Sequence, residues 1–311
     1  MSLLESRMTL RNLRLIVVIA REGNLVRAAQ AMNMTQSAVT KALQEAEATI
    51  GAPLFDRTNR GVLPTAMGEA LIAHAQVILA QIRHAEQELA DLRDGSSGTV
   101  VVGTLLAASA LLLPRAIARV KAARPNLIVR IVEGTNDTLM PQLRNGTIDL
   151  VVGRLPVFRE RDGIEQEELL DDHAAVVARA GHPLGGRASL TLGDMAGQRW
   201  ILPRPETTLR RQVDEAFRAA GLRAPQGDVE SMSVLANREI LLRTDYLTVW
   251  PLELARIEAR TGAFTILPVD LSQTRRPVGI STRANGRLTP AAEVFIRALR
   301  ETAARDLSAD T

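Results

Sequence analysis

A seven-residue repeat of apolar side chains runs through residues 65–93. The repeating positions are Leu71, Ala75, Ile78, Ile82, Ala85, Leu89 and Leu92. This spacing predicts one helix, roughly 40 Å long at about 1.5 Å per residue, with a narrow apolar seam along one side. A long helix with such a seam usually packs against another helix, so we expect it to pair with the same helix of a second chain. The alternative is that the seam packs on its own domain.

Length and composition limit the class of protein. With 311 residues, the chain exceeds the usual size of one domain, so two or more domains are expected. Hydrophobic residues make up 46% and charged residues 23%, which excludes a disordered or fibrous chain. No apolar run reaches the roughly 18 residues of a membrane-spanning helix, and the first residues do not form a secretory signal. The absence of cysteine excludes disulfides and thiol chemistry, and these features together predict a cytoplasmic protein.

The first 65 residues have the pattern of a helix-turn-helix followed by a hairpin. The predicted helices span residues 10–20, 25–32 and 35–50. Thr35 is a suitable N-cap for the third helix, and Gly51 follows its end. The alanines of the second helix allow a close approach, and a three-residue turn sets the third helix at a steep angle, as in many DNA-binding proteins. Residues 53–64 contain turn residues around short apolar pairs, which predicts a two-stranded wing.

The third predicted helix has a polar face that suits DNA. If Val39, Leu43, Ala46 and Ile50 face inward, the outward side chains are Gln36, Ser37, Thr40, Lys41 and Gln44. Amide and ammonium groups can contact base edges, while hydroxyl groups suit phosphates or bases. Arg57 and Arg60 flank the tip of the hairpin, where a wing would meet phosphates. The alternative is a plain helical bundle with a polar exterior.

Strands and helices alternate after residue 98. Residues 94–98 (DGSSG) have the composition of a linker. Strands are predicted at residues 100–105, 127–132, 148–152, 174–178, 200–202, 247–249 and 277–282. Helices are predicted at residues 110–123, 137–145, 206–220, 234–243 and 290–304. Continuous aliphatic strands joined by helices predict a parallel sheet covered on both faces.

Patterns typical of catalysis or metal binding are missing from the sequence. The four histidines, His74, His84, His173 and His182, have neither metal-ligand spacing nor an adjacent carboxylate pattern. No glycine-rich phosphate loop and no nucleophile elbow around a serine occur. We therefore predict no enzyme activity, no cofactor and no metal site.

Several segments resemble LysR-type transcriptional regulators in order and spacing. The matching segments near the N-terminus are 25–32 (LVRAAQAM), 35–41 (TQSAVTK), 51–57 (GAPLFDR), 60–61 (RG), 64–65 (PT) and 68–69 (GE). Segments 146–153 (GTIDLVVG) and 248–251 (TVWP) resemble the effector domain of the same family. The resemblance spans the whole chain and implies a ligand-responsive regulator that binds promoter DNA.

The resemblance also implies an α/β architecture with a mostly helical N-terminal part. Residues 1–65 would form a winged helix-turn-helix domain, residues 66–94 a dimerisation helix and residues 95–98 a hinge. Residues 99–304 would form an effector domain similar to a periplasmic binding protein. Its two α/β subdomains would comprise about residues 99–164 with 270–304, and about residues 165–269. The family further implies a homodimer through the long helix and a homotetramer through the effector domains.

Polar residues near the ends of predicted strands indicate where an effector would bind. Open parallel sheets bind ligands beyond the carboxyl ends of their strands, beside helix N-termini. Ser109, Thr135, Asn136 and Arg154 lie at such ends, and the resemblance places Arg204, Ser231 and Met232 on the opposite wall. Because the arginines would supply a cation, we expect a small anionic or hydroxylated metabolite. The alternative is that Ser109 and Thr135 are only helix caps and that both arginines are solvated.

A second function class remains open from the sequence. The chain could be a small-molecule binding protein or an enzyme whose N-terminal helices only assemble it. The salt dependence of binding to duplex DNA separates the two classes, because counterion release gives a steep slope only for a true DNA binder.

Overall fold

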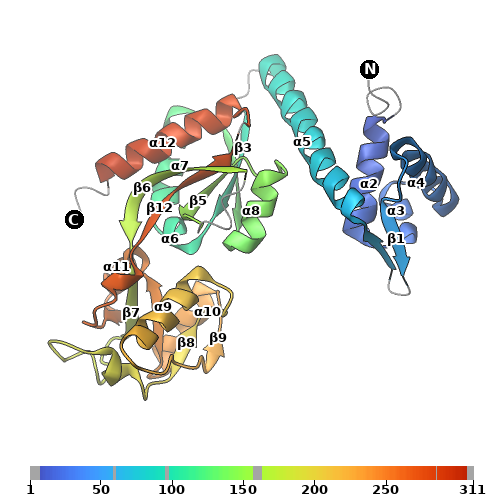
Figure 1. Cartoon of the computed structure of the whole chain (residues 1–311). Helices are drawn as coiled ribbons and strands as arrows, with labels where there is room; N and C mark the ends of the chain where they lie inside the picture. Colours follow the sequence, from blue (N-terminus) through green and yellow to red (C-terminus); the bar gives the residue numbers. More distant parts are fainter. Residues whose placement is uncertain (1–7, 59–60, 95–97, 157–162, 285, 307–311) are drawn as a thin grey trace. The chain divides into compact units, whose positions relative to one another are not determined.

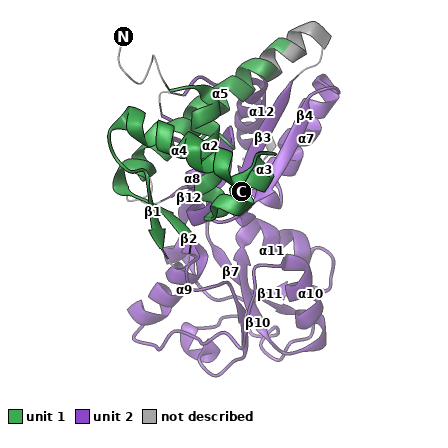
Figure 2. Cartoon of the chain, turned by 90° about the vertical axis from the view of Figure 1, so that its right-hand side faces the viewer, with its two compact units in different colours: residues 1–96, 144–147 green, residues 97–143, 148–311 purple. Residues whose placement is uncertain are grey.

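The described part of the chain forms two compact units. The computed structural model describes residues 8–58, 61–94, 98–156, 163–284 and 286–306. The N-terminal unit comprises residues 1–96 with 144–147, and the C-terminal unit comprises residues 97–143 with 148–311 (Figure 2). Within the described residues, no helix combines the length and the apolar character needed to cross a bilayer.

Short helices and a hairpin make up most of the N-terminal unit (Figure 1). These elements are α2 (Leu10–Glu22), α3 (Leu25–Ala31), α4 (Gln36–Ile50), β1 (Phe55–Thr58) and β2 (Gly61–Pro64). Thr9, Asn24 and Thr35 cap the three helices through their side-chain oxygens. Gly23 and Gly51 follow α2 and α4 in the left-handed conformation, with φ of 59° and 81°. The predicted helices, the turn between α3 and α4, and the hairpin are therefore confirmed.

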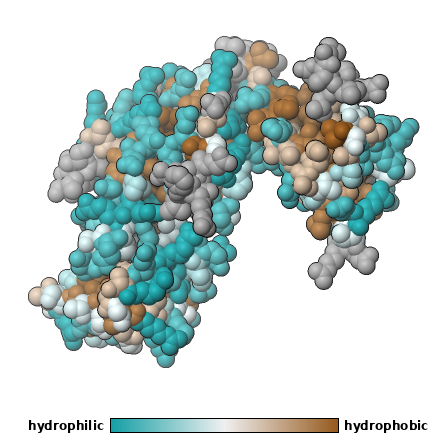
Figure 3. All heavy atoms as spheres, viewed as in Figure 1, coloured by the Kyte–Doolittle hydropathy of each residue, from teal (hydrophilic) through white to brown (hydrophobic). Residues whose placement is uncertain are grey.

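The long helix α5 (Ala66–Asp94) has the predicted extent, but its seam divides into two parts. In the first part, Ala75 is fully buried and Leu71 packs against the core of the N-terminal unit, so this stretch does pack on its own domain. In the second part, Ile78 is 42% exposed and Leu89 is 67% exposed. Figure 3 shows apolar surface over α5. The side chain of Leu92 lies outside the described residues.

The first sheet of the C-terminal unit has the strand order β4-β3-β5-β12-β6. Its strands are β3 (Thr99–Thr104), β4 (Ile128–Glu133), β5 (Leu150–Arg154), β6 (Ile164–Asp172) and β12 (Arg276–Arg283). Its helices are α6 (Leu106–Ser109), α7 (Leu112–Ala123), α8 (Asn136–Arg144) and α12 (Pro290–Asp306). Helices α7 and α12 cover one face and α8 covers the other, with buried aliphatic side chains at both contacts (Figure 1).

The second sheet of the C-terminal unit has the order β11-β7-β10-β8-β9. Its strands are β7 (Ala174–Arg179), β8 (Trp200–Leu202), β9 (Val229–Glu230), β10 (Leu247–Pro251) and β11 (Phe264–Ile266). Its helices are α9 (Thr208–Ala219), α10 (Val234–Arg243) and α11 (Leu252–Ala259), with short 3-10 turns η2 (Leu192–Met195) and η3 (Ser272–Thr274).

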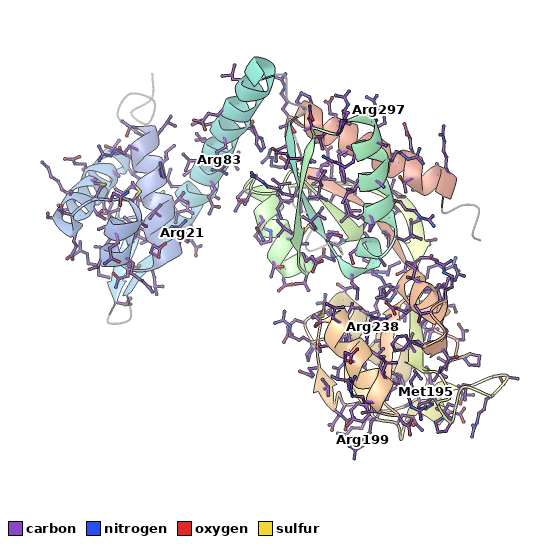
Figure 4. All side chains as sticks on the ribbon, turned by 180° about the vertical axis from the view of Figure 1, so that it is seen from behind. Arg21, Arg83, Met195, Arg199, Arg238 and Arg297 are labelled. Carbon is purple, nitrogen blue, oxygen red and sulfur yellow. The ribbon has the colours of Figure 1, made fainter. Side chains whose placement is uncertain are left out.

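Aromatic rings fill both faces of this second sheet. Trp200 meets Phe217 of α9 edge-on on one face, with ring centroids 6.2 Å apart. Trp250 meets Phe264 on the other face, at 5.7 Å. The guanidinium of Arg238 on α10 (labelled in Figure 4) lies 5.6 Å from the centre of the Phe264 ring. The second sheet therefore has a core of its own, separate from the aliphatic core of the first sheet.

The sheets are mixed, which corrects the prediction of a parallel sheet. Strand β3 is parallel to β4 and β5, and β8 is parallel to β9 and β10. Strands β12 and β7 are antiparallel to the neighbours with which they pair. A run of aliphatic residues indicates that a strand is buried, but it does not indicate whether the strand is parallel or antiparallel to its neighbours. That direction depends on the connections by which the chain passes between the two sheets.

Three strands and two helices of the C-terminal unit were not predicted, namely β6, β9, β11, α6 and α11. Strand β6 carries five acidic residues and lies at the edge of the first sheet, so it lacks an aliphatic pattern. Its Glu167 accepts two hydrogen bonds from Arg300 of α12 (2.7 and 2.8 Å), which raise the pKa of Arg300.

The boundary between the two sheets also differs from the prediction. Strand β6 belongs to the first sheet, so the chain passes to the second sheet after Asp172, and not near residue 164 as expected. Strand β4 is also an edge, and its Ile128 and Ile131 are exposed, so the first sheet is not covered throughout.

Candidate DNA-binding face and effector cleft

Helix α4 has one apolar and one polar face. Val39, Leu43 and Ala46 are buried against α2 and α3, with at most 3% of each exposed. The opposite face holds the five predicted DNA contacts: Gln36, Ser37, Lys41 and Gln44 are exposed and Thr40 is half-buried. The structure therefore brings all five to one side of one helix. Polar groups in a row along an exposed helix suit the major groove, which admits an α-helix.

The first residues of α4 are held in place by a short hydrogen-bond system. The Thr35 hydroxyl accepts a hydrogen bond from the Ala38 N–H (3.2 Å) and lies 3.0 Å from the Ser37 hydroxyl. Farther along, the Lys41 ammonium lies 4.0 Å from the Glu45 carboxylate, and both side chains are exposed. Since exposed ion pairs are weak, Lys41 is available to an anion such as a phosphate.

The hairpin presents one predicted arginine. Arg57 is exposed on β1, where it pairs in register with Val62 of β2. Arg60 lies outside the described residues. The hairpin is fixed to the first helices because the Val62 N–H donates to the Gly23 carbonyl (2.9 Å). A cation on an anchored hairpin is positioned to contact a phosphate.

A cleft of about 740 Å³ opens in the C-terminal unit between residues of the first and second sheets. This volume lies within the range of ligand pockets. From the first sheet and its helices, the lining residues are Thr104, Leu105, Leu106, Ser109, Ala110, Glu133, Gly134, Thr135, Thr138 and Gln142. From the second, they are Arg204, Met232, Ser233, Val234, Leu235 and Leu254.

The cleft continues into a recess of about 60 Å³. The recess shares Leu105, Leu106, Gly134, Thr135 and Met232 with the cleft and adds Ala107, Asn136, Arg154, Pro203, Thr207, Thr208, Leu209 and Pro251. Such a volume holds a small chemical group and not a whole metabolite. The lining of the recess is mostly apolar, with a few polar groups among aliphatic and proline side chains.

The structure brings six of the seven predicted effector residues to this cavity. Ser109, Thr135, Arg204 and Met232 line the cleft, and Asn136 and Arg154 line the recess. Ser231 lines neither; its hydroxyl accepts a hydrogen bond from the Ser233 N–H (3.1 Å), and Ser233 lines the cleft instead. Ser109 was predicted to precede a helix, and this is wrong. It is the last residue of the short helix α6, where its hydroxyl donates to the Leu106 carbonyl (3.0 Å).

The two candidate arginines differ in their surroundings. Arg204 is exposed, whereas Arg154 is only 5% exposed, so the alternative that both are solvated is wrong for Arg154. The Arg154 guanidinium donates to the Asp172 carboxylate at 2.9 Å and to the Gln212 side-chain carbonyl at 2.6 Å. The other oxygen of Asp172 accepts the Leu252 N–H at 3.0 Å. Arg154 thus joins strand β5 of the first sheet to helix α9 of the second.

Some lining residues were not found from the sequence. Thr138 and Gln142 lie four residues apart on α8, so both reach the same side of that helix, and this spacing was a usable signal. Thr207 caps α9 by accepting the Arg210 N–H, which starts α9 two residues later than the predicted helix. Among the described residues, no group of three or more histidine, aspartate or glutamate side chains is arranged to hold a metal ion.

Two family models match the chain in order. Residues 10–69 match the model of the bacterial regulatory helix-turn-helix protein, lysR family, and residues 93–304 match the LysR substrate binding domain. The chain belongs to the LysR family. This LysR-type transcriptional regulator thus combines a helix-turn-helix with a substrate-binding domain, and the alternative of a binding protein or enzyme with an assembly module is not favoured.

Relatives and solved structures cover nearly the whole LysR-type chain. The HTH-type transcriptional regulator GbpR of Azospirillum brasilense is 34% identical over 299 residues, which cover 96% of this chain and 87% of GbpR. A variant of full-length OxyR from Pseudomonas aeruginosa has a TM-score of 0.66 at 26% identity, with 94% of this chain and 98% of OxyR covered. Full-length CbnR complexed with its target DNA has the same fold, with a TM-score of 0.65 at 20% identity over 95% of this chain and 100% of CbnR.

Proposed function

We propose that this regulator reads promoter DNA with α4, contacts the DNA backbone with its wing, and responds to a small molecule bound in the cleft. In this proposal Gln36, Ser37, Thr40, Lys41 and Gln44 contact the major groove, and Arg57 and Arg60 contact phosphates. The observation that carries the proposal is the row of polar side chains on α4, which is exposed while the opposite face is buried. The proposed function includes no enzyme activity and no cofactor.

We expect Gln36→Ala to weaken binding to a specific operator by about 1–3 kcal/mol while binding to unrelated duplex DNA changes little. Gln36 is exposed at the start of α4, and an amide there can make two hydrogen bonds with a base edge. Fluorescence anisotropy with operator and random duplexes measures both affinities.

Arg57→Ala is the matched control for that variant. A phosphate contact does not depend on sequence, so the affinities for the operator and for random duplex DNA should fall alike. The slope of log affinity against log salt concentration should become less steep by about one unit, as expected for the loss of one phosphate contact. Equal losses on both duplexes for Gln36→Ala would remove its role in reading bases.

The effector is proposed to be anionic or hydroxylated and to contact Ser109, Thr135, Asn136, Arg154, Arg204 and Met232. The cleft volume and its mixture of hydroxyl, amide and charged side chains support this proposal. Ser231 stays in the proposal only as the residue that positions Ser233.

Met232→Trp is expected to abolish the response to the effector and to leave operator affinity within about twofold. Met232 borders both the cleft and the recess and is 38% exposed, so a larger ring there fills space without breaking a hydrogen bond. A promoter–reporter assay in cells measures the response, and anisotropy measures operator affinity. A full response in this variant would place the effector outside the cleft.

The assembly is proposed to be a homodimer through α5 and a homotetramer through the effector domains. In this scheme residues 1–65 form the DNA-binding domain, residues 66–94 the dimer helix, residues 95–98 the hinge, and residues 99–304 the effector domain. The exposed Ile78 and Leu89 on α5, together with Ile128 and Ile131 on edge strand β4, support two contact surfaces. As a bacterial-type regulator the protein would work where the chromosome is, in the cytoplasm.

A further inference from the structure

Two helix N-termini from different sheets meet at the recess. Asn136 begins α8, which packs on the first sheet, and Thr208 begins α9, which packs on the second. The first N–H groups of a helix have no partner within the helix. Those of Asn136, Thr208 and Leu209 make no hydrogen bond within the described residues, and all three residues line the recess. Both helix ends carry partial positive charge, so the recess favours an anion.

Buried side chains at the same place also lack partners. Asn136 is only 5% exposed, and neither polar atom of its amide has a hydrogen-bond partner in the structure. The Nε–H of the buried Arg154 is likewise without an acceptor. These are side-chain atoms, additional to the backbone N–H groups of the helix ends, and most of them are donors. The recess therefore lacks an acceptor-rich group.

The charges around the recess limit what this group can be. Asp172 does not fill the role, because its two oxygens are already bonded to Arg154 and to the Leu252 N–H. Since Asp172 compensates the charge of Arg154, the surroundings suit one negative charge and not two. Among common metabolite groups, a carboxylate has one charge, two acceptor oxygens and a size that fits about 60 Å³.

The wider cleft has a different character from the recess. Its lining includes the hydroxyls of Ser109, Thr135, Thr138 and Ser233 and the amide of Gln142, which can donate to or accept from a ligand hydroxyl. Glu133 also borders the cleft, and its negative charge opposes a second carboxylate on the ligand.

We propose that the recess binds the carboxylate of a hydroxylated monocarboxylic acid, whose hydroxyl-bearing body lies in the cleft. The donors are the N–H groups at the starts of α8 and α9 and the side chains of Asn136 and Arg154. The inference rests on the proposed effector function of the cleft and adds the chemical class of its ligand. Because α8 and α9 belong to different sheets, one carboxylate between them ties the two halves of the effector domain together.

Calorimetry on the full-length protein tests the ligand class with a matched pair of probes. Gluconate and sorbitol have the same six-carbon hydroxylated body and differ at one end, where the first has a carboxylate and the second a hydroxyl. With sodium chloride added to equalise ionic strength, gluconate is expected to bind at millimolar concentration or better. Sorbitol is expected to bind at least about tenfold more weakly, since it offers one neutral acceptor in place of the carboxylate.

Thr208→Pro tests the N–H donor without disturbing the fold. Proline is well tolerated at the first position of a helix, and Thr207 before it is extended (ψ 146°), as a residue before proline prefers. This variant removes the N–H of residue 208 and should weaken gluconate binding about tenfold. Thr208→Ala is the matched control, because it keeps the N–H and should bind gluconate within about twofold of the parent.

Asn136→Leu provides a second variant, which keeps the number of side-chain heavy atoms but removes both polar atoms of the amide, and it should also weaken gluconate binding. Equal binding of gluconate and sorbitol, no binding of gluconate, or unchanged gluconate binding by a folded Thr208→Pro variant would each overturn the proposed ligand class. If both probes bind equally and Asn136→Leu weakens both, the cleft remains the effector site and only the carboxylate is wrong. Failure of the cleft itself is seen separately, as a full reporter response in Met232→Trp.

Discussion

Replacing Ile78 and Ile82 with aspartate is expected to abolish the dimer and, with it, tight binding to a two-half-site operator. In the single chain Ile78 is 42% exposed and Ile82 is half-buried, so most of the added charge remains solvated and the N-terminal unit should stay folded. In a paired seam both carboxylates would be buried without partners, and each would make the free energy of dimerisation less favourable by at least about 3 kcal/mol. Sedimentation measures the oligomer, and anisotropy measures operator affinity.

A control for this variant places two aspartates elsewhere on α5. Gln76→Asp with Arg83→Asp changes positions that lie away from the heptad seam, and Figure 4 labels Arg83 on this helix. This control should remain dimeric. Intact dimers of the Ile78→Asp and Ile82→Asp double variant would show that the seam pairs with something other than a second copy of α5.

The N-terminal elements were predictable because their signals are local. Thr35 caps α4 through a hydrogen bond three residues away, and Gly51 ends the same helix with a positive φ, so both ends are encoded by neighbouring residues. The division of the α5 seam was not predictable in this way. Ala80 lies beyond the exposed Ile78 and is fully buried, so burial along α5 depends on which side of the helix is covered, and a heptad pattern does not record this.

The effector domain was harder to predict because its decisive features are long-range. Residues 106–113 (LAASALLL) are uniformly apolar or small, so no periodicity marks the break between α6 and α7, and Ser109 was placed before a helix rather than at the end of one. Strand β6 is stabilised by its partner β12, more than a hundred residues away, and its own acidic sequence does not suggest a strand.

The recess illustrates the same limit for a site. The sequence did not distinguish Arg154 from Arg204 as the cation, since nothing local shows that Arg154 meets Asp172 and Gln212. Asn136 was found because it follows a strand end, while the start of α9 was missed because its contact with the recess comes from packing between sheets. Local signals thus located Ser109, Thr135 and Asn136 on one wall of the cavity, and the family resemblance placed Arg204 and Met232 on the other. Only the tertiary structure shows that the start of α9 reaches the recess.

Asp172→Asn is expected to lower the free energy of unfolding of the C-terminal unit by about 3–5 kcal/mol. Both charged side chains of the Arg154–Asp172 pair are nearly inaccessible, at 6% and 3% exposure, so the change leaves a guanidinium buried without its counter-charge. Urea unfolding followed by tryptophan fluorescence is a suitable measurement, because Trp200 and Trp250 both lie in this unit.

Glu167→Gln is the matched control, since it neutralises one carboxylate of an ion pair whose partners are 56% and 39% exposed. Water already solvates those charges, so its effect should stay within about 1 kcal/mol. A second comparison separates the buried charge from the lost hydrogen bonds. Replacing both partners, Arg154→Met with Asp172→Leu, should restore much of the stability, because no unpaired charge then remains inside. If Asp172→Asn is as mild as Glu167→Gln, water reaches Arg154 and the buried ion pair between β5 and β6 does not stabilise the C-terminal unit.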